Sequence, residues 1–190
     1  MERVIFITTG ATAPFPELVA KALSPECLAE FEKEGFTKVY LQCGDVLAEF
    51  QKGTYIPPQG TCRLSVEAFD FKNSLHDDMR LCQAKEGVRK QGLIIMHAGA
   101  GTVMDAMRLG LAMIVVANPA LLDNHQDELA QELEDQNYAT RSDVDGLAKA
   151  IRVALMKQSK PWAPQHATVK NIIDDVVGYQ ADVSSRLVLD

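Results

Sequence analysis

The sequence predicts one α/β domain with three layers, in which a parallel sheet lies between two layers of helices. Short apolar runs alternate with helical patterns along the chain, which is typical of parallel strands joined by crossover helices. Two of these runs, residues 93–96 and 113–117, are apolar at every position, as expected for strands buried on both faces. The length of 190 residues fits one domain that forms its own core.

Strands and helices are expected in a regular order. The expected strands cover Val4–Ile7, Val39–Cys43, 64–68, Leu93–Met96 and Met113–Ala117. Helices are expected from Glu17 onward and over Pro25–Lys33, Asn73–Lys85, Thr102–Leu109, Asp123–Gln136 and Asp143–Lys157. Residues 44–60 are expected to be irregular, because Gly53, Pro57 and Pro58 mark turns there.

The domain is expected to span residues 1–158, and residues 159–190 form a tail. A helix is expected over residues 168–179 of the tail, because its aliphatic residues follow the spacing of one helical face: Val169, Ile172, Ile173, Val176 and Val177. Two interpretations of this stripe stay open. It packs on the core of its own chain, or it contacts a partner protein.

The composition excludes several classes of partner. The chain has 26 acidic and 19 basic residues and a formal net charge of -7. It has no dense basic block, so we expect neither nucleic-acid binding nor direct binding to anionic membrane. No apolar stretch approaches the roughly 20 residues that span a bilayer, and the N-terminus carries no targeting signal. The four cysteines lack C-x-x-C spacing and are expected to be reduced thiols of a cytoplasmic protein.

A loop of small residues follows the first expected strand. It reads Thr8-Thr9-Gly10-Ala11-Thr12, and ligands of parallel sheets bind beyond the carboxyl ends of the strands. Small residues allow backbone N–H groups to approach a phosphate, and the hydroxyl groups of Thr9 and Thr12 add donors. The alternative is a tight turn that binds nothing, since the loop is neither a P-loop nor a G-x-G-x-x-G motif.

A second glycine-rich loop follows the buried strand at Leu93–Met96. It reads His97-Ala98-Gly99-Ala100-Gly101-Thr102, and its glycines expose a helix N-terminus, which attracts anions. Asp105 lies one helical turn after Thr102, where a carboxylate can accept hydrogen bonds from both hydroxyls of a ribose. The alternatives are a capping or packed role for His97 and a simple first-turn charge at Asp105.

A third group of polar residues begins the helix after the strand at 113–117. Asp123-Asn124-His125-Gln126 provides donors and acceptors that suit the hydroxyl groups of a sugar. A plain helix start is the alternative, with Asp123 as the N-cap and an acidic first turn. That alternative accounts for Asp127 and Glu128 but not for residues 124–126.

The second and third loops together resemble the donor-binding half of the GT-B glycosyltransferases. This resemblance implies a Rossmann-like domain that is the C-terminal half of a GT-B enzyme. It implies that His97 contacts one donor phosphate, that Gly101 and Thr102 line the other, and that Asp105 holds the ribose. His125 and Gln126 would contact the sugar. The chain has Gly101 where some relatives have Asn, and His125 where others have Asp or Gln.

A closer resemblance covers about the first 155 residues. Residues 9–16, Phe69-Asp70-Phe71, His97-Ala98-Gly99 and residues 123–126 are similar to the family of small cytosolic subunits of the eukaryotic UDP-N-acetylglucosamine transferase, and to the C-terminal domain of bacterial MurG. With His97 as the catalytic residue, the expected donor-binding set is Thr9, Gly10, Ala11, Thr12, Phe71, Gly99, Ala100, Gly101, Thr102, Asp105, Asn124, His125 and Gln126.

The resemblance also implies that a separate protein supplies the acceptor-binding half of the enzyme. In this family a membrane-anchored subunit binds the acceptor, a dolichol-linked N-acetylglucosamine, and recruits the small subunit to the cytosolic face of the endoplasmic reticulum. The implied reaction transfers N-acetylglucosamine from UDP-N-acetylglucosamine with inversion, without a cofactor or metal. A general base is not evident, and either the partner carries it or the protein has none.

The sequence leaves three alternative functions. A nucleotide-binding regulatory module would also show half an active site. A dehydrogenase-type Rossmann domain is disfavoured, because no G-x-G-x-x-G motif follows the first strand. A self-sufficient transferase is disfavoured, because 190 residues leave no room for a second domain.

Overall fold

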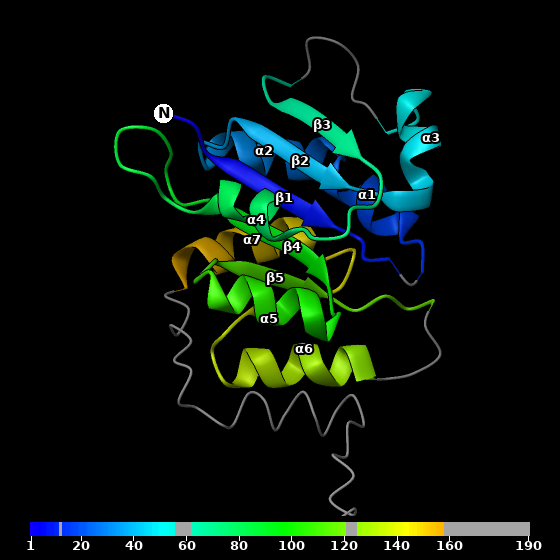
Figure 1. Cartoon of the computed structure of the whole chain (residues 1–190), viewed down its shortest axis with the longest axis vertical. Helices are drawn as coiled ribbons and strands as arrows, with labels where there is room; N and C mark the ends of the chain where they lie inside the picture. The colour runs from blue at the N-terminus through cyan, green and yellow to red at the C-terminus, as the bar shows by residue number, and fades with distance from the viewer. Residues whose placement is uncertain (12, 56–61, 121–124, 158–190) are drawn as a thin grey trace, which may run out of the picture.

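The protein forms a six-stranded parallel sheet covered by helices on both faces (Figure 1). The computed structural model describes residues 1–11, 13–55, 62–120 and 125–157. The strands are β1 (Val4–Thr8), β2 (Lys38–Gln42), β3 (Ser65–Phe69), β4 (Leu93–His97), β5 (Met113–Val116) and β6 (Thr140–Ser142). Their order in the sheet is β3-β2-β1-β4-β5-β6, with every neighbouring pair parallel. The predicted α/β class is confirmed.

The helices connect successive strands. They are α1 (Pro16–Ala22), α2 (Pro25–Lys33), α3 (Leu47–Gln51), α4 (His76–Met79), α5 (Ala100–Arg108), α6 (His125–Asp135) and α7 (Leu147–Met156), with short 3₁₀ turns at Gly44–Val46 and Arg80–Cys82. None of these helices is long and apolar enough to cross a membrane, among the residues that the structure describes.

The alternation of side chains along β1 divides the core into two layers. Ile5 and Ile7 pack with α1, α2 and α7 on one face, whereas Val4 and Phe6 pack with α5 and α6 on the other. All five residues of β1 are buried, because this strand lies in the interior of the sheet between β2 and β4. The two cores hold the carboxyl ends of the strands at one edge, where the predicted loops lie.

Several predicted elements are corrected. Residues 44–60 are not wholly irregular, since they contain α3, and the expected helix over 73–85 is reduced to α4 and a 3₁₀ turn because the backbone is extended at Gln83. The helix after β4 begins at Ala100 rather than Thr102, and α7 begins at Leu147 rather than Asp143. Strand β6 was not predicted, because its three residues, Thr140–Ser142, show no apolar pattern. The tail lies outside the described residues.

Candidate functional site

A pocket of about 360 Å³ lies at the carboxyl ends of the central strands. It is bounded by the loops after β1, β3 and β4 and by the first turn of α5. Most of the predicted donor-binding residues of these loops line it: Gly10, Ala11, Phe71, His97, Gly99, Ala100, Gly101 and Thr102. Residues from three segments that are far apart in the sequence therefore meet at one place, as the topology of a parallel sheet requires.

The imidazole of His97 lies between two glycines. A Cβ added at Gly10 would lie 2.4 Å from Cε1 of His97, and one added at Gly99 would lie 2.2 Å from Nε2. Gly10 also has a φ of +80°, which favours glycine. No larger residue fits at either position without moving the ring, so these glycines set the place of the imidazole rather than merely making the loops flexible.

The state of His97 follows from its burial. Desolvation lowers the pKa of His97 below its ordinary value of about 6.5, so the ring is neutral at pH 7. Its Nδ1 atom is buried and has no hydrogen-bond partner among the described residues. Buried polar atoms normally have partners, and an unpaired one in a pocket points to a ligand or a water molecule. His97 is not the cap of α5, because Gly99 occupies the N-cap position.

The first turn of α5 closes one side of the pocket. The N–H groups of a helix's first turn have no partner within the helix and carry partial positive charge. Here that turn is formed by small residues, Ala100 and Gly101, followed by Thr102, and a Cβ added at Gly101 would meet no atom within 4 Å. The turn is thus open to an anion from the pocket.

Gln42, at the end of β2, fixes the loop after β1. Thr8 Oγ1 donates to Gln42 Oε1 at 2.7 Å, and Gln42 Nε2 donates to the carbonyl of Gly10 at 3.4 Å. The hydroxyl of Thr9 donates to the backbone carbonyl of Gln42 at 3.4 Å, and Thr9 is buried. Thr9 was predicted to bind the nucleotide-sugar donor. Its hydroxyl instead bonds to the backbone of Gln42, and Thr9 does not line the pocket.

Lys72 lines the pocket and was missed in the sequence. Its ammonium lies 2.6 Å from Oδ1 of Asp78, 3.2 Å from the hydroxyl of Tyr40 and 4.0 Å from the ring centroid of Phe69. The hydrogen bond to Asp78 raises the pKa of Lys72, which keeps the charge in place. The only sequence signal was a single lysine directly after Phe69-Asp70-Phe71.

Phe71 stands beside Lys72 at the pocket wall. Its side chain is exposed, and its ring lies against Gly44, where an added Cβ would meet Cζ at 2.4 Å. Gly44 has a φ of +49°. The close approach places an aromatic face at the mouth of the pocket, where it can pack against a planar ligand group.

Asp105 lies one turn beyond the pocket on α5. Its carboxylate is 43% exposed and pairs with Nη1 of Arg108 at 3.1 Å. The position matches the expected spacing from Thr102, but Asp105 does not line the pocket itself. A ligand that extends from the first turn of α5 along the helix surface would reach it, at the cost of competing with Arg108.

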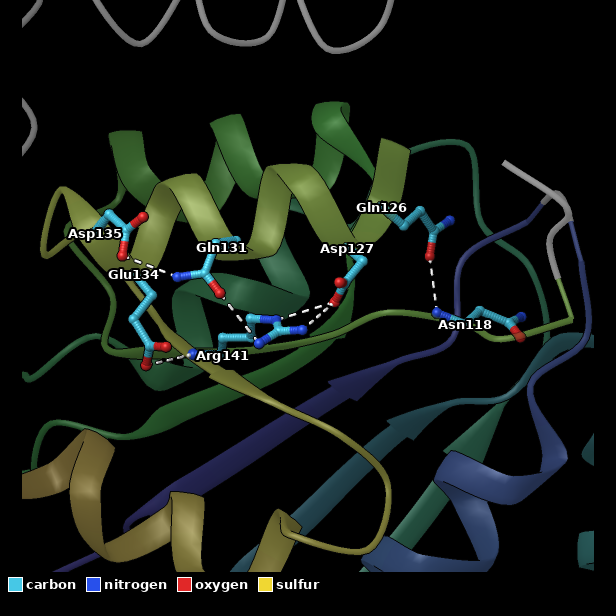
Figure 2. A network of polar contacts seen from close by, with 7 residues as sticks. All are labelled: Asn118, Gln126, Asp127, Gln131, Glu134, Asp135 and Arg141. Carbon is cyan, nitrogen blue, oxygen red and sulfur yellow. Dashed lines mark hydrogen bonds and ion pairs between the residues drawn. The ribbon is translucent and has the colours of Figure 1, made fainter. Parts of the chain in front are cut away.

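The remaining predicted residues lie elsewhere. Gln126, in the first turn of α6, lines a separate cavity of about 840 Å³ bounded by α6, α7 and the loops after β5 and β6. Its Oε1 accepts a hydrogen bond from the backbone N–H of Asn118 at 3.0 Å (Figure 2). His125 Nδ1 lies 3.6 Å from Glu128. Thr12 and Asn124 lie outside the described residues.

The larger cavity is not at the glycine loops. Its charged lining includes Asp127, Asp143, Asp145, Arg141 and Lys149. The helix N-terminus and the unpaired histidine nitrogen both lie at the smaller pocket. No group of three or more His, Cys, Asp or Glu side chains in the described ranges is arranged to hold a metal ion.

Comparisons with known proteins show the family and the fold of the chain. The glycosyltransferase family 28 C-terminal domain matches residues 4–177. The UDP-N-acetylglucosamine transferase subunit ALG13 of Saccharomyces cerevisiae is 29% identical, with 87% of this chain and 91% of that protein covered. The subunit of the same name from Eremothecium gossypii is 31% identical, with 86% and 87% covered.

Two solved structures are similar over most of the chain. A solution structure of ALG13 superposes with a TM-score of 0.67 at 27% identity and covers 93% of this chain and 96% of that one. The crystal structure of Acinetobacter baumannii MurG has a TM-score of 0.60 at 19% identity, and 50% of the MurG chain is covered. The second likeness concerns the fold alone. The chain thus belongs to the glycosyltransferase family 28 C-terminal domain family and to the family of the ALG13 UDP-N-acetylglucosamine transferase subunits.

Proposed function

We propose that this chain is the donor-binding subunit of a UDP-N-acetylglucosamine transferase. In this proposal it adds the second N-acetylglucosamine to the dolichol-diphosphate-linked monosaccharide in the synthesis of N-glycan precursors. The observation that carries the proposal is the pocket at the ends of β1, β3 and β4, in which a neutral histidine with an unpaired nitrogen faces the open first turn of a helix.

The pocket suits the diphosphate of the donor. Backbone N–H groups at Ala100, Gly101 and Thr102 are available to the phosphate oxygens, and the glycine at position 10 lets the opposite loop approach closely. The neutral ring of His97 carries one N–H group, which would donate a hydrogen bond to a phosphate oxygen. These donors stabilise the charge that develops on UDP as the sugar leaves.

The rest of the donor extends from this point. Asp105 would accept hydrogen bonds from the ribose hydroxyls after releasing Arg108. Phe71 would pack against the base, and Gln126 with His125 would contact the sugar from the start of α6. We expect no cofactor or metal in this inverting displacement, since backbone N–H groups and His97 would stabilise the charge on the leaving group.

A partner subunit is proposed from the names of the relatives, since ALG13 is called a subunit of the transferase. The related ALG13 chain is covered over 96% of its length, whereas half of MurG is covered. A GT-B active site lies between two domains, and in this proposal a second protein supplies the acceptor-binding half. We propose that this partner is membrane-anchored and holds the subunit at the cytosolic face of the endoplasmic reticulum. The tail, residues 159–190, is proposed as part of the contact with it.

The test is co-expression with a candidate membrane-anchored subunit, followed by an assay with UDP-N-acetylglucosamine and a lipid-linked N-acetylglucosamine. Transfer by the pair, with neither subunit active alone, supports the proposal. Donor binding without transfer by any pairing would instead support the rival interpretation, a nucleotide-binding module without chemistry of its own.

The His97→Gln variant of the same pair tests the role of the histidine. Its turnover should fall by about ten- to a hundredfold while its melting temperature changes little, because a lost hydrogen bond to the leaving group acts on the transition state. A loss of rate that merely follows the loss of folded protein would assign His97 a structural role only.

A further inference from the structure

We infer that Arg141, on the edge strand β6, is a positioning residue that fixes the sugar-contacting start of α6. The inference rests on the proposed function, in which Gln126 faces the donor sugar. Arg141 lies more than a dozen residues after Gln126 in the sequence and does not itself belong to any predicted motif. Figure 2 shows the contacts that carry the argument.

The guanidinium of Arg141 contacts α6 at two successive turns. Nε and Nη2 both donate to Oδ1 of Asp127, at 3.0 and 2.6 Å, and Nη1 donates to Oε1 of Gln131 at 3.1 Å. Its backbone N–H also donates to Oε1 of Glu134 at 3.2 Å. One residue of β6 thus binds three side chains spaced over about two turns of the helix.

These three side chains form one stripe of α6. Asp127, Gln131 and Glu134 are spaced i, i+4 and i+7, so they lie along one face of the helix. A second stripe, Leu129, Ala130 and Leu133, is buried in the core. Two stripes held at different angles fix the rotation of the helix about its axis, which neither stripe does as well alone.

The rotation of α6 sets the direction of Gln126. Gln126 directly precedes Asp127 in the sequence. Its Oε1 accepts a hydrogen bond from the backbone N–H of Asn118, in the loop after β5. Asn118 in turn donates from Nδ2 to the carbonyl of Pro14 at 3.2 Å. Gln126 is therefore tied to the loops after β5 and β1, and with Oε1 occupied it presents its NH₂ group to a ligand.

Apolar packing of α6 is modest. Of its 11 residues only Leu129, Ala130 and Leu133 are buried, and one of the three is an alanine. A guanidinium that donates twice to one carboxylate oxygen and once to a neighbouring amide holds geometry better than an isolated surface ion pair. We therefore assign to the Arg141 network the orientation of the first turn of α6 rather than the stability of the domain.

The test uses the full chain with three variants. Arg141→Met removes the guanidinium but keeps most of the aliphatic side chain. Arg141→Lys keeps the charge but loses the paired N–H donors to Asp127. Arg152→Met is the matched control, because Arg152 pairs with Glu30 at 3.3 Å between α7 and α2 and is similarly exposed.

The first readout needs no sugar donor. Hydrogen exchange at the backbone amide of Asn118 should become about tenfold faster in Arg141→Met, since Gln126 no longer holds its acceptor in place. It should change little in Arg152→Met. Unchanged exchange in Arg141→Met would overturn the inference, whatever the donor of the enzyme proves to be.

The second readout is the ratio of the affinities for UDP-N-acetylglucosamine and UDP. This ratio should fall about threefold to tenfold in Arg141→Met, be partly kept in Arg141→Lys and be unchanged in the control. A merely structural role would lower both affinities equally, which would contradict the inference. A wild-type chain with no preference for the sugar donor, combined with faster exchange in Arg141→Met, would refute the proposed function while leaving the positioning contact supported.

Discussion

The two polar regions at the carboxyl edge of the sheet are built differently. Around His97 the loops after β1 and β4 pack closely, with Gly10 and Gly99 against the imidazole, and Gln42 adds hydrogen bonds to the loop after β1. At the start of α6 the chain is held by side-chain hydrogen bonds, between Asn118 and Gln126 and between Arg141 and Asp127. Close packing thus dominates in the first region and side-chain hydrogen bonding in the second.

This difference bears on what each region recognises. A diphosphate is the constant part of a nucleotide-sugar donor, and a fixed pocket with helix N–H groups suits it. In the proposed function the sugar lies at the start of α6, where several separate hydrogen bonds share the positioning. Substitutions near His97 should therefore reduce UDP affinity strongly. Substitutions on α6 should each reduce sugar recognition by a smaller amount.

The largest effect is expected from Gly99→Ala. The new Cβ would lie 2.2 Å from Nε2 of His97 and displace the ring, so affinity for UDP should fall by more than about tenfold, with a loss of about 1–3 kcal/mol in stability. Gly101→Ala is the contrast for stability, because a Cβ there meets nothing within 4 Å and lies in a helix. That variant should unfold at a higher temperature than wild type. If both variants have the same stability, the close packing of His97 is not what fixes the loop.

Asp105→Asn should have the next largest effect. Loss of a charged acceptor for the ribose hydroxyls should weaken UDP binding by about 1–3 kcal/mol, measured by calorimetry. Arg108→Gln separates this role from the ion pair at 3.1 Å, since it leaves the carboxylate of Asp105 in place. Equal affinities for UDP in wild type and Asp105→Asn would remove Asp105 from the site.

Lys72→Met should have a moderate effect. Its loss removes a positive charge from the pocket wall, so UDP affinity should fall about threefold to tenfold. It also leaves Asp78, a residue that is 9% exposed, without its partner. Lys38→Met is a matched control, because Lys38 also pairs with a carboxylate, Glu67 at 2.7 Å, and lies over the ring of Tyr40. Lys38 is at the opposite end of β2. Similar losses in both variants would indicate a general charge effect.

The smallest expected effect is a pH dependence of stability due to His97. Its pKa is lowered in the folded chain, so as pH falls below about 6.5 the unfolded chain binds the proton first and the free energy of unfolding decreases. Above that pH this contribution is constant. Urea unfolding between pH 5 and 8 should show a shallower decline at low pH in His97→Gln than in wild type. Identical slopes would indicate that the ring is not desolvated.

The predictable parts of the molecule are those with local signals. The buried strands at Leu93–Met96 and Met113–Ala117 were predicted to within one residue, because a continuous apolar run constrains the chain locally. The predicted start of α5 was two residues late, because Gly101 lies inside the helix and resembles a loop. The predicted start of α7 was four residues early, because Gly146 and not Asp143 occupies the N-cap position.

The unpredictable parts depend on distant segments. Lys72 acquires its place from Tyr40 on β2 and Asp78 on α4, and neither partner is evident from its neighbours in the sequence. Strand β6 is too short and polar to show a period. The same holds for Arg141, since only the fold brings it beside Asp127. The donor-binding roles of the predicted residues stay predictions.

We propose that the donor diphosphate binds in the small pocket rather than in the larger cavity. Backbone amide chemical shifts of the full chain, titrated with UDP, distinguish the two locations. We expect the largest changes at Gly10, Phe71 and residues 99–102, with little change over residues 142–149. Changes concentrated at residues 142–149, with those at 99–102 unaffected, would contradict the account, because the nucleotide would then occupy the cavity between α6 and α7.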